Sequence, residues 1–285
     1  MTVVRLPRVI VSDVDGLPVR LRAPHDLSFT ARWGSVFAVL DQQDSGNLCL
    51  GVAGPAGRVF VKYAGAPTAR YDGVIETAVG SLRGAAEVYR ALAHPSLVTL
   101  REAVDVGGGH ALVFDWTDAT PLGRQYERAH VVRSLSLPVR VDAVRQILDF
   151  HVHAAALGWV AIDLYDGSVM IDAESGRVVL CDLDFYERAP VVNRMGRMWG
   201  SSRFMSPEEY ELGAPIDEVT NVFVLGALAH TFMGDDATKS RAAWVGSDAQ
   251  FDAAARAVRP DRDARWPSVA ALAEAWRAAS FATGA

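Results

Sequence analysis

Aspartates gather in one stretch near the middle of the chain, GWVAIDLYDGSVMIDAESGRVVLCDLDFY. Asp163 opens a polar loop that also contains Asp166 and Ser168, and Asp182 and Asp184 follow the apolar run VVLC. Carboxylates at the ends of neighbouring short strands can hold a hard divalent cation and orient a hydroxyl for attack, as phosphoryl transfer requires. The structural alternative is that Asp163 and Asp166 cap turns and that Asp182 pairs with a buried arginine.

A second candidate residue is Lys62, an ammonium within the apolar strand sequence RVFVKYA. Alternation along the strand places Lys62 on one face with Phe60 and Ala64. If both faces of the strand are covered, the ammonium is buried and needs an anionic partner. If the strand lies at the edge of a sheet, Lys62 is merely solvated.

The turn DQQDSGN precedes the strand LCLGVA. Its residues Ser45, Gly46 and Asn47 could bring backbone N–H groups against an anion such as a phosphate. Turns of this composition are common. The turn therefore indicates a phosphate site only in combination with other residues.

Two kinds of structure must position these residues. Up to about residue 116, short β-branched and apolar runs broken by turn residues predict a sheet, apart from residues 72–93, whose period of three to four predicts an amphipathic helix. From about residue 138 the helical period dominates, with a strand-rich segment at residues 160–186. We therefore predict an α+β fold with a small β-rich N-terminal lobe, residues 1–116, and a larger, mainly helical C-terminal lobe, residues 117–285. A cleft between two such lobes is a natural place for a small ligand.

The composition excludes several classes of function. The 28 Lys and Arg against 34 Asp and Glu give a net charge of −6, so no positive field over the whole surface attracts nucleic acid or an anionic membrane. No apolar stretch has the length of a membrane span, and the N-terminal sequence lacks the pattern of a signal peptide. Cys49 and Cys181 lie in apolar runs without metal-ligand spacing, which is typical of reduced thiols. We expect a cytoplasmic protein with no nucleic-acid or membrane partner.

In their order along the chain, these segments resemble the protein kinase-like superfamily, over about residues 35–278. VFVKYA is similar to the strand that carries the ATP-anchoring lysine, which corresponds to Lys62. AIDLYDGSV is similar to the catalytic loop, with Asp163 as the catalytic aspartate, and LCDLD to the metal-binding segment, with Asp182 as its aspartate. The resemblance implies a two-lobed protein kinase-like fold that binds ATP and Mg²⁺.

The resemblance extends to the hinge and to two late motifs. ALVFDWTDATPL is similar to the hinge, with Phe114 as the gatekeeper. The residues whose backbone groups would then meet adenine are Asp115, Trp116 and Thr117. MSPEE is similar to the Ala-Pro-Glu motif that ends the activation segment, and ARAVRPDRDARWPS to the late segment that carries an arginine. The resemblance therefore implies a buried ion pair between Glu208 and Arg265.

The anionic partner of Lys62 has three candidates. The family pattern puts Ala85 where the glutamate that pairs with the lysine normally lies. Because an ammonium on a covered strand needs an anion, Glu87 is the first alternative, Glu76 the second and Asp182 the third. We expect Glu87 to join Lys62 in the nucleotide site.

The departures from the family pattern concern the catalytic loop. Ala161 and Ile162 replace its His and Arg, and Ser168 replaces its metal-binding Asn, for which Asp166 could compensate. Tyr165 stands where Ser/Thr protein kinases usually place a lysine that touches the transferred phosphoryl group. Without the Arg, control by phosphorylation of the activation loop is not expected.

Two function classes remain open. The first is an ATP- and Mg²⁺-dependent phosphotransferase, in which Asp163 orients the acceptor hydroxyl, Lys62 holds the α/β-phosphates and Asp182 holds the metal. Further metal ligands would come from Asp166, Ser168 or Asp184. The second class is a nucleotide-binding or non-catalytic scaffold, a pseudokinase. Retention of three charges that would each cost desolvation favours the enzyme.

The acceptor is either a protein or a small molecule. The MSPEE segment favours a protein Ser/Thr kinase, as in the bacterial eukaryotic-type kinases. The missing lysine and the single glycine of DSGN favour a small molecule, as in the aminoglycoside phosphotransferases. A further departure from the family pattern, which does not bear on the acceptor, is that Asn221 replaces an aspartate of the helix that supports the catalytic loop. We favour the protein acceptor.

Overall fold

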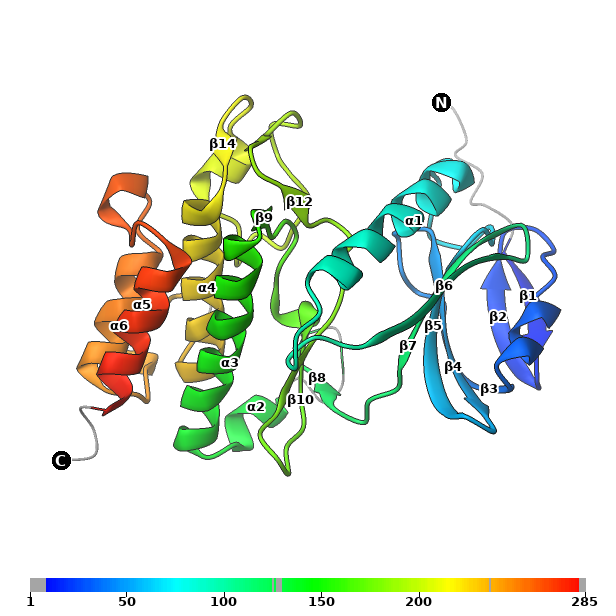
Figure 1. The fold of residues 1–285 in the computed structure, drawn as a ribbon, viewed down its shortest axis with the longest axis horizontal. Coiled ribbons are helices and arrows are strands. Elements are labelled where there is room, and N and C mark those ends of the chain that lie inside the picture. The colour runs from blue at the N-terminus through cyan, green and yellow to red at the C-terminus, as the bar shows by residue number, and fades with distance from the viewer. Residues whose placement is uncertain (1–8, 125, 127–129, 236, 282–285) are drawn as a thin grey trace, which may run out of the picture. The chain divides into compact units, whose positions relative to one another are not determined.

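The computed structural model describes residues 9–124, 126, 130–235 and 237–281. Over these residues the chain is a mixed α+β protein with six α-helices and several small sheets, which confirms the predicted fold class at this level (Figure 1). It divides into two compact units, which we call the sheet unit (Met1–Ala91 and Val98–Thr117) and the helical unit (Leu92–Leu97 and Asp118–Ala285). The kinase-like arrangement of two lobes stays a prediction.

The sheet unit is built on an antiparallel sheet in the strand order β3-β4-β5-β7-β6. The strands are β3 (Ser35–Leu40), β4 (Asn47–Gly54), β5 (Gly57–Ala64), β6 (Leu100–Val106) and β7 (Gly109–Asp115). A separate hairpin of β1 (Ile10–Val14) and β2 (Leu17–Leu21) precedes it, with the 3-10 helix η1 (Ser28–Arg32) between hairpin and sheet in the chain. β5, the strand that carries Lys62, is therefore the central strand.

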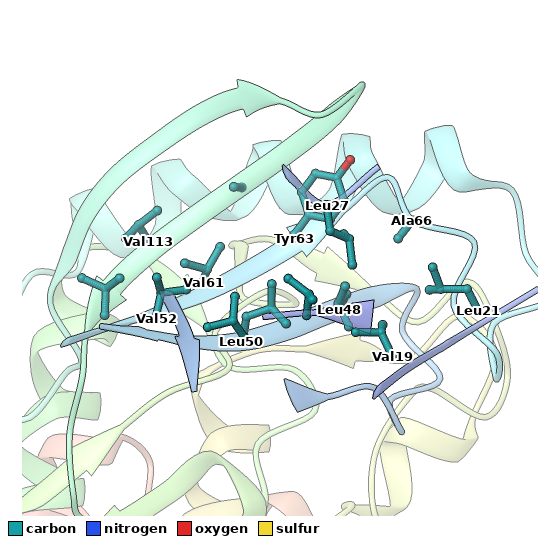
Figure 2. Packing of buried hydrophobic residues seen from close by; sticks show 14 residues of the cluster. Val19, Leu21, Leu27, Leu48, Leu50, Val52, Val61, Tyr63, Ala66 and Val113 are labelled. Carbon is teal, nitrogen blue, oxygen red and sulfur yellow. The ribbon is translucent and has the colours of Figure 1, made fainter. Parts of the chain in front are cut away.

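One face of the sheet holds the apolar core of this unit. Because side chains alternate across a strand, Leu48 and Leu50 of β4 share a face with Val61 and Tyr63 of β5 (Figure 2). Val19 of the hairpin packs into the same cluster, and all five side chains are fully buried. Burying a side chain of this size stabilises the fold by about 1.5–3 kcal/mol relative to leaving it exposed.

Helix α1 (Ile75–Ala91) packs on the other face of the sheet. Its buried residues are Ala78, Leu82, Ala85, Ala86, Val88 and Tyr89. The ring of Tyr89 contacts that of Phe114 on β7, with the ring centroids 4.7 Å apart. The helix predicted over residues 72–93 is thus present, with ends that are two or three residues shorter.

The helical unit contains the remaining α-helices of the described residues. They are α2 (Val131–Ser134), α3 (Leu137–Ala156), α4 (Glu218–Met233), α5 (Asp248–Ala257) and α6 (Val269–Phe281). The last four pack side by side (Figure 1). α4 is buried almost all round because it is apolar on every side, as a central helix must be. Among the residues that the structure describes, no helix is both long enough and apolar enough to cross a bilayer.

Short strands position the aspartates of the helical unit. β10 (Val169–Ile171) pairs with β11 (Val178–Leu180) and with β8 (Thr120–Pro121). The other pairs are β9 (Trp159–Val160) with β12 (Glu187–Arg188) and β13 (Val191–Val192) with β14 (Pro215–Ile216). The 3-10 helices are η2 (Asp166–Ser168), η3 (Pro207–Tyr210), η4 (Arg241–Ala243) and η5 (Arg262–Ala264). Asp163 thus follows β9, and Asp182 follows β11.

Candidate functional site

Two segments of the helical unit that the sequence singles out lie side by side. The N–H of Cys181, just before Asp182, donates to the carbonyl oxygen of Ser168 at 3.0 Å. The thiol of Cys181 lies 4.0 Å from the carbonyl oxygen of Gly167. The loop that begins at Asp163 and the strand end that carries Asp182 therefore form one neighbourhood.

The backbones at Asp163 and Asp182 are unusual. Both residues have a left-handed backbone, with φ of 57° and 62°. Among the described non-glycine residues, only Asp15 and Lys239 share a positive φ. Left-handed residues cost energy and occur preferentially at functional sites, and aspartate tolerates the conformation better than most residues do. Both side chains are half-buried, so the fold strains its backbone at the two carboxylates that the sequence selects.

Asn221 of α4 holds the start of the segment that leads to Asp163. Its Oδ1 accepts a hydrogen bond from the N–H of Ala161 at 2.8 Å, and its Nδ2 donates to the carbonyl oxygen of Ala161, also at 2.8 Å. Asn221 is buried. An aspartate could accept the first bond but could not donate the second. The asparagine therefore holds both backbone groups of the residue two positions before Asp163.

Asp166 is placed differently from the sequence expectation. Its buried carboxylate accepts a hydrogen bond from Arg203 at 2.9 Å, and the two form a salt bridge. A carboxylate that is already neutralised by a guanidinium is a poor ligand for a cation. This contact disfavours Asp166 as a metal ligand, and its role at the metal stays a prediction. Arg203 lies 37 residues further along the chain, and its sequence context GSSRFM contains no signal of this contact.

Magnesium in proteins usually takes one or two carboxylates together with phosphate oxygens and water. The half-buried Asp182 can supply such a carboxylate. The hydroxyl of Ser168 is buried and has no hydrogen-bond partner among the described residues, which fits a role as a ligand. Among all the residues that the structure describes, no group of three or more His, Cys, Asp or Glu side chains is arranged to hold a metal ion by itself. Asp182 and Ser168 therefore fit a magnesium ion that shares its coordination with phosphates.

The two aspartates of DLDF are distinguished by their neighbourhood. The carboxylate of Asp182, but not that of Asp184, contributes with Asp163 to raising the pKa of the Tyr165 hydroxyl. Burial is the larger cause of that shift. The carboxylates of Asp182 and Asp163 therefore both lie close enough to Tyr165 to influence its hydroxyl. Because Asp182 shares this neighbourhood with Asp163, it is a better candidate for the metal ligand than Asp184.

Lys62 lies on the central strand of the sheet unit and is only 9% exposed. Across the strands it faces Cys49 of β4 and Leu112 of β7. This excludes the alternative of a solvated lysine on an edge strand. A buried ammonium is costly unless an anion compensates it.

The expected pairing of Lys62 with Glu87 is wrong. Glu87 is exposed on α1 and forms no ion pair with any described residue. Ala85 and Val88 face the sheet, and at 100° per residue Glu87 is turned well away from Ala85. Glu76, the second alternative, is also exposed. Neither glutamate of α1 therefore pairs with Lys62 in the described residues.

The turn Ser45–Gly46–Asn47 is more enclosed than an open anion cradle. Gly46 has φ of 81°, and a methyl group built on it would lie 2.9 Å from both Ala78 of α1 and the ring of Tyr71. Asn47 is already the first residue of β4 and pairs with Ala64. Only Ser45 is exposed. The expectation that all three residues offer N–H groups to a phosphate is therefore not supported, because tertiary packing covers the turn.

Two of the three expected hinge residues already use their backbone N–H groups in hydrogen bonds within the sheet unit. The N–H of Asp115 donates to the carbonyl oxygen of Thr99 at 2.9 Å, and the N–H of Trp116 to that of Arg58 at 3.4 Å. The Trp116 ring packs edge-on against Phe37, with the ring centroids 4.8 Å apart. Of the three residues expected to meet adenine, Asp115 and Trp116 therefore use their N–H groups within the sheet unit. The placement of Thr117 at the base stays a prediction.

The predicted ion pair between Glu208 and Arg265 is confirmed. Arg265 donates two hydrogen bonds to the Glu208 carboxylate, at 2.7 and 2.9 Å, and both side chains are buried. Burial would raise the pKa of Glu208, but the hydrogen bonds from Arg265 and the charges of Arg265 and Arg262 lower it below its ordinary value. Arg262 also donates to Glu208, at 2.6 Å. The sequence reasoning missed Arg262, although it lies in the same RPDRDAR stretch.

Comparison with known protein families found no match for this sequence, and comparison with curated proteins found none either. Of the expected residues, the structure brings Asp163, Ser168 and Asp182 together in the helical unit. It buries Lys62 in the sheet unit, and it leaves Glu87 exposed on α1.

Proposed function

We propose that this chain is an ATP- and Mg²⁺-dependent phosphotransferase of the protein kinase-like class, which transfers the γ-phosphoryl group of ATP to a hydroxyl. The observation that carries the proposal is the pair of left-handed aspartates, Asp163 and Asp182, in one neighbourhood. In this assignment Asp163 orients the acceptor hydroxyl and takes its proton. Asp182, with Ser168, would hold the magnesium, which would neutralise the charge of the phosphates.

Lys62 supports the proposal from the sheet unit. Lys62 lies on a central strand beside Cys49 and Leu112, where burial of a charged group costs desolvation. An ammonium there is useful when it meets an anion, and we assign it to the α/β-phosphates of ATP. The ion pair of Glu208 and Arg265, which the resemblance to the kinase-like superfamily implies, supports the same class.

The acceptor that we favour is a Ser or Thr side chain of a protein. The MSPEE segment, which resembles the protein-kinase branch, is held by local hydrogen bonds. Ser206 and Glu209 form a capping box at the start of η3. Glu208 ties the same segment to Arg265. A small molecule of the antibiotic type is the alternative, supported by the single glycine of DSGN.

A second candidate function is a nucleotide-binding or non-catalytic pseudokinase scaffold. Three observations favour it: Gly46 is covered by Tyr71, Asp166 is taken by Arg203, and Glu87 is exposed. Each removes one contact that an active phosphotransferase would use. The two candidates differ in whether Mg²⁺ changes nucleotide binding and whether ATP is consumed.

A thermal-shift titration with ATP, with and without Mg²⁺, tests the proposal. A ligand present at 100 times its dissociation constant stabilises the native state by about 2.7 kcal/mol. We expect a clear shift with ATP and Mg²⁺ and a smaller one with ATP alone. Asp182→Asn, which tolerates the left-handed backbone as alanine would not, should abolish the Mg²⁺ dependence, and Glu174→Ala, an exposed acid of the same unit, should preserve it. Equal shifts for wild type and Asp182→Asn would reject the metal assignment, and no shift in any condition would reject nucleotide binding.

A further inference from the structure

A buried chain of hydrogen bonds connects helix α3 with the segment that follows Asp182. Its members are His151 of α3 and Tyr186, which are 2% and 4% exposed. The hydroxyl oxygen of Tyr186 lies 2.9 Å from Nε2 of His151. Nδ1 of His151 lies 2.7 Å from the carbonyl oxygen of Ile147, one turn earlier in α3. The function proposed above gives neither side chain a role.

The partners of His151 fix which atom carries each proton. A carbonyl oxygen can only accept, so Nδ1 of His151 donates to Ile147. Burial lowers the pKa of His151 to about 4, so the imidazole is neutral at neutral pH and its Nε2 carries no proton. Tyr186 therefore donates its hydroxyl proton to Nε2. Both imidazole nitrogens and the phenol are thus used inside the protein.

The helix end of this chain is held by packing. α3 packs against α4 and α6 within the helical unit. The ring of Phe150, beside His151, also contacts the ring of Tyr186, with the ring centroids 6.5 Å apart. A hydrogen bond favours a narrow range of distances and angles. The bond to His151 therefore sets the place and the direction of the Tyr186 side chain relative to α3.

Asp182 lies between two such points of attachment. Before it, the N–H of Cys181 donates to the carbonyl oxygen of Ser168 at 3.0 Å. After it, the N–H of Tyr186 donates to the carbonyl oxygen of Leu183 at 3.1 Å, and the Tyr186 side chain is bonded to α3. Asp182 itself has a left-handed backbone, with φ of 62°. Such a conformation persists only where the surrounding structure determines it.

We infer that His151 and Tyr186 are positioning residues, which hold the backbone of Asp182 in the orientation that its carboxylate needs to bind magnesium. This inference rests on the proposed function and deepens it, because it names the residues that prepare the metal site. Neither side chain is expected to touch the metal or the nucleotide, since the polar atoms of both are used within the helical unit.

The variant Tyr186→Phe tests the inference, because it removes the donor and keeps the ring. The affinity for ATP is measured by calorimetry with and without Mg²⁺, well below the melting temperature of the variant. We expect the factor by which Mg²⁺ raises the affinity to fall about tenfold, or about 1.4 kcal/mol. The affinity for ATP alone should not change. Tyr210→Phe, at an exposed tyrosine of the same unit, is the matched control and should change neither quantity.

A double variant separates positioning from stability. Tyr186→Phe alone leaves the buried Nε2 of His151 without its donor, so the melting temperature should fall. Adding His151→Leu removes both polar partners, and replacing both partners of a buried hydrogen bond by apolar groups is nearly neutral for stability. The melting temperature should then return towards that of wild type, while the effect of Mg²⁺ should stay reduced because an apolar contact has no preferred direction. A merely structural role would restore both quantities together.

The outcomes separate this inference from the function on which it rests. An unchanged effect of Mg²⁺ in Tyr186→Phe, or its full recovery in the double variant, would overturn the positioning role and leave the proposed function standing. An equal loss of affinity with and without Mg²⁺ would also overturn it, because the whole nucleotide site would then be affected. If the double variant does not regain stability, the effect of Mg²⁺ in Tyr186→Phe decides. If wild type binds no ATP, or binds it without any effect of Mg²⁺, the proposed function itself fails, and this is seen before any variant is measured.

Discussion

Replacing Glu208 by glutamine removes the carboxylate that neutralises the buried Arg265 and that also binds Arg262, which keeps its second partner Asp217. Arg265 is fully buried and donates two hydrogen bonds to Glu208, and Arg262 donates one more. Removing one partner of a buried ion pair costs about 3–5 kcal/mol, because the other charge stays buried without compensation. Glu208→Gln should therefore destabilise the protein by about this amount.

The assay is thermal unfolding at neutral pH. For a unit of 150–250 residues, which is the size of the helical unit that contains Glu208, 1 kcal/mol changes the melting temperature by about 2–4 °C, so the expected fall is about 6–20 °C. The control is Glu211→Gln, at an exposed glutamate three residues away, which should stay within about 0.5 kcal/mol of wild type. A melting temperature of Glu208→Gln that equals that of the control would refute this reasoning.

The pH dependence gives the same prediction a second readout. The pKa of Glu208 is lowered from its ordinary value of 4.5. Its contribution to stability is therefore complete above pH 4.5 and is lost as the pH falls through the lower folded-state pKa. The difference in stability between wild type and Glu208→Gln should shrink in that acid range and stay constant near neutral pH.

Three further predictions concern other residues. Asn221→Asp should cost about 1–3 kcal/mol, because the carbonyl oxygen of Ala161 loses its donor in a buried place; thermal unfolding of this variant, with Asn221→Ala for comparison, measures the loss. His230 is fully buried, and burial lowers its pKa to about 4, so its contribution to stability is complete above its ordinary value of 6.5 and falls by up to about 1.4 kcal/mol per pH unit as the pH drops from there towards 4. Burial raises the pKa of Glu209 to about 7, so this residue changes the stability in the opposite direction over the same pH range. Measuring the unfolding free energy of His230→Phe and of wild type from pH 7 to pH 4 isolates the contribution of the histidine. If the unfolding free energy of the two proteins changes equally with pH, the lowered pKa of His230 is contradicted. Glu87→Gln should leave the affinity for ATP unchanged because Glu87 is exposed, and a tenfold loss in calorimetry would restore Glu87 to the site.

The period of the apolar residues predicted the local structure, that is, where a helix forms and which face of it is buried. The apolar residues of the segment 72–93 predicted α1, and Ala85 and Val88 face the sheet as that period requires. The same period places Glu87 away from the sheet. The assignment of Glu87 to Lys62 failed because it followed the family alignment instead of the angular position on the helix.

Contacts between distant parts of the chain were predicted only where the resemblance supplied them. The pair of Glu208 and Arg265 spans 57 positions and has no local signature. The salt bridge of Asp166 with Arg203 and the Tyr71 ring over Gly46 were missed, because such contacts depend on how loops pack and not on spacing. The burial of Lys62 was predicted in part. Alternation along the strand predicted which face of β5 carries Lys62, but only the strand order of the sheet showed that β5 is a central strand.

The most direct test of the central claim is to follow the γ-phosphoryl group itself. The protein is incubated with Mg²⁺ and ATP labelled at the γ-phosphate, together with an array of Ser- and Thr-containing peptides, and the label on each peptide is counted. We predict label on a subset of peptides, its loss without Mg²⁺, and a fall of at least a hundredfold in Asp163→Asn, since general acid–base catalysis typically contributes about 10²–10⁴ in rate. Label transfer that is equal in wild type and Asp163→Asn, or no transfer to peptides or to water under conditions where ATP and Mg²⁺ bind, would contradict the claim.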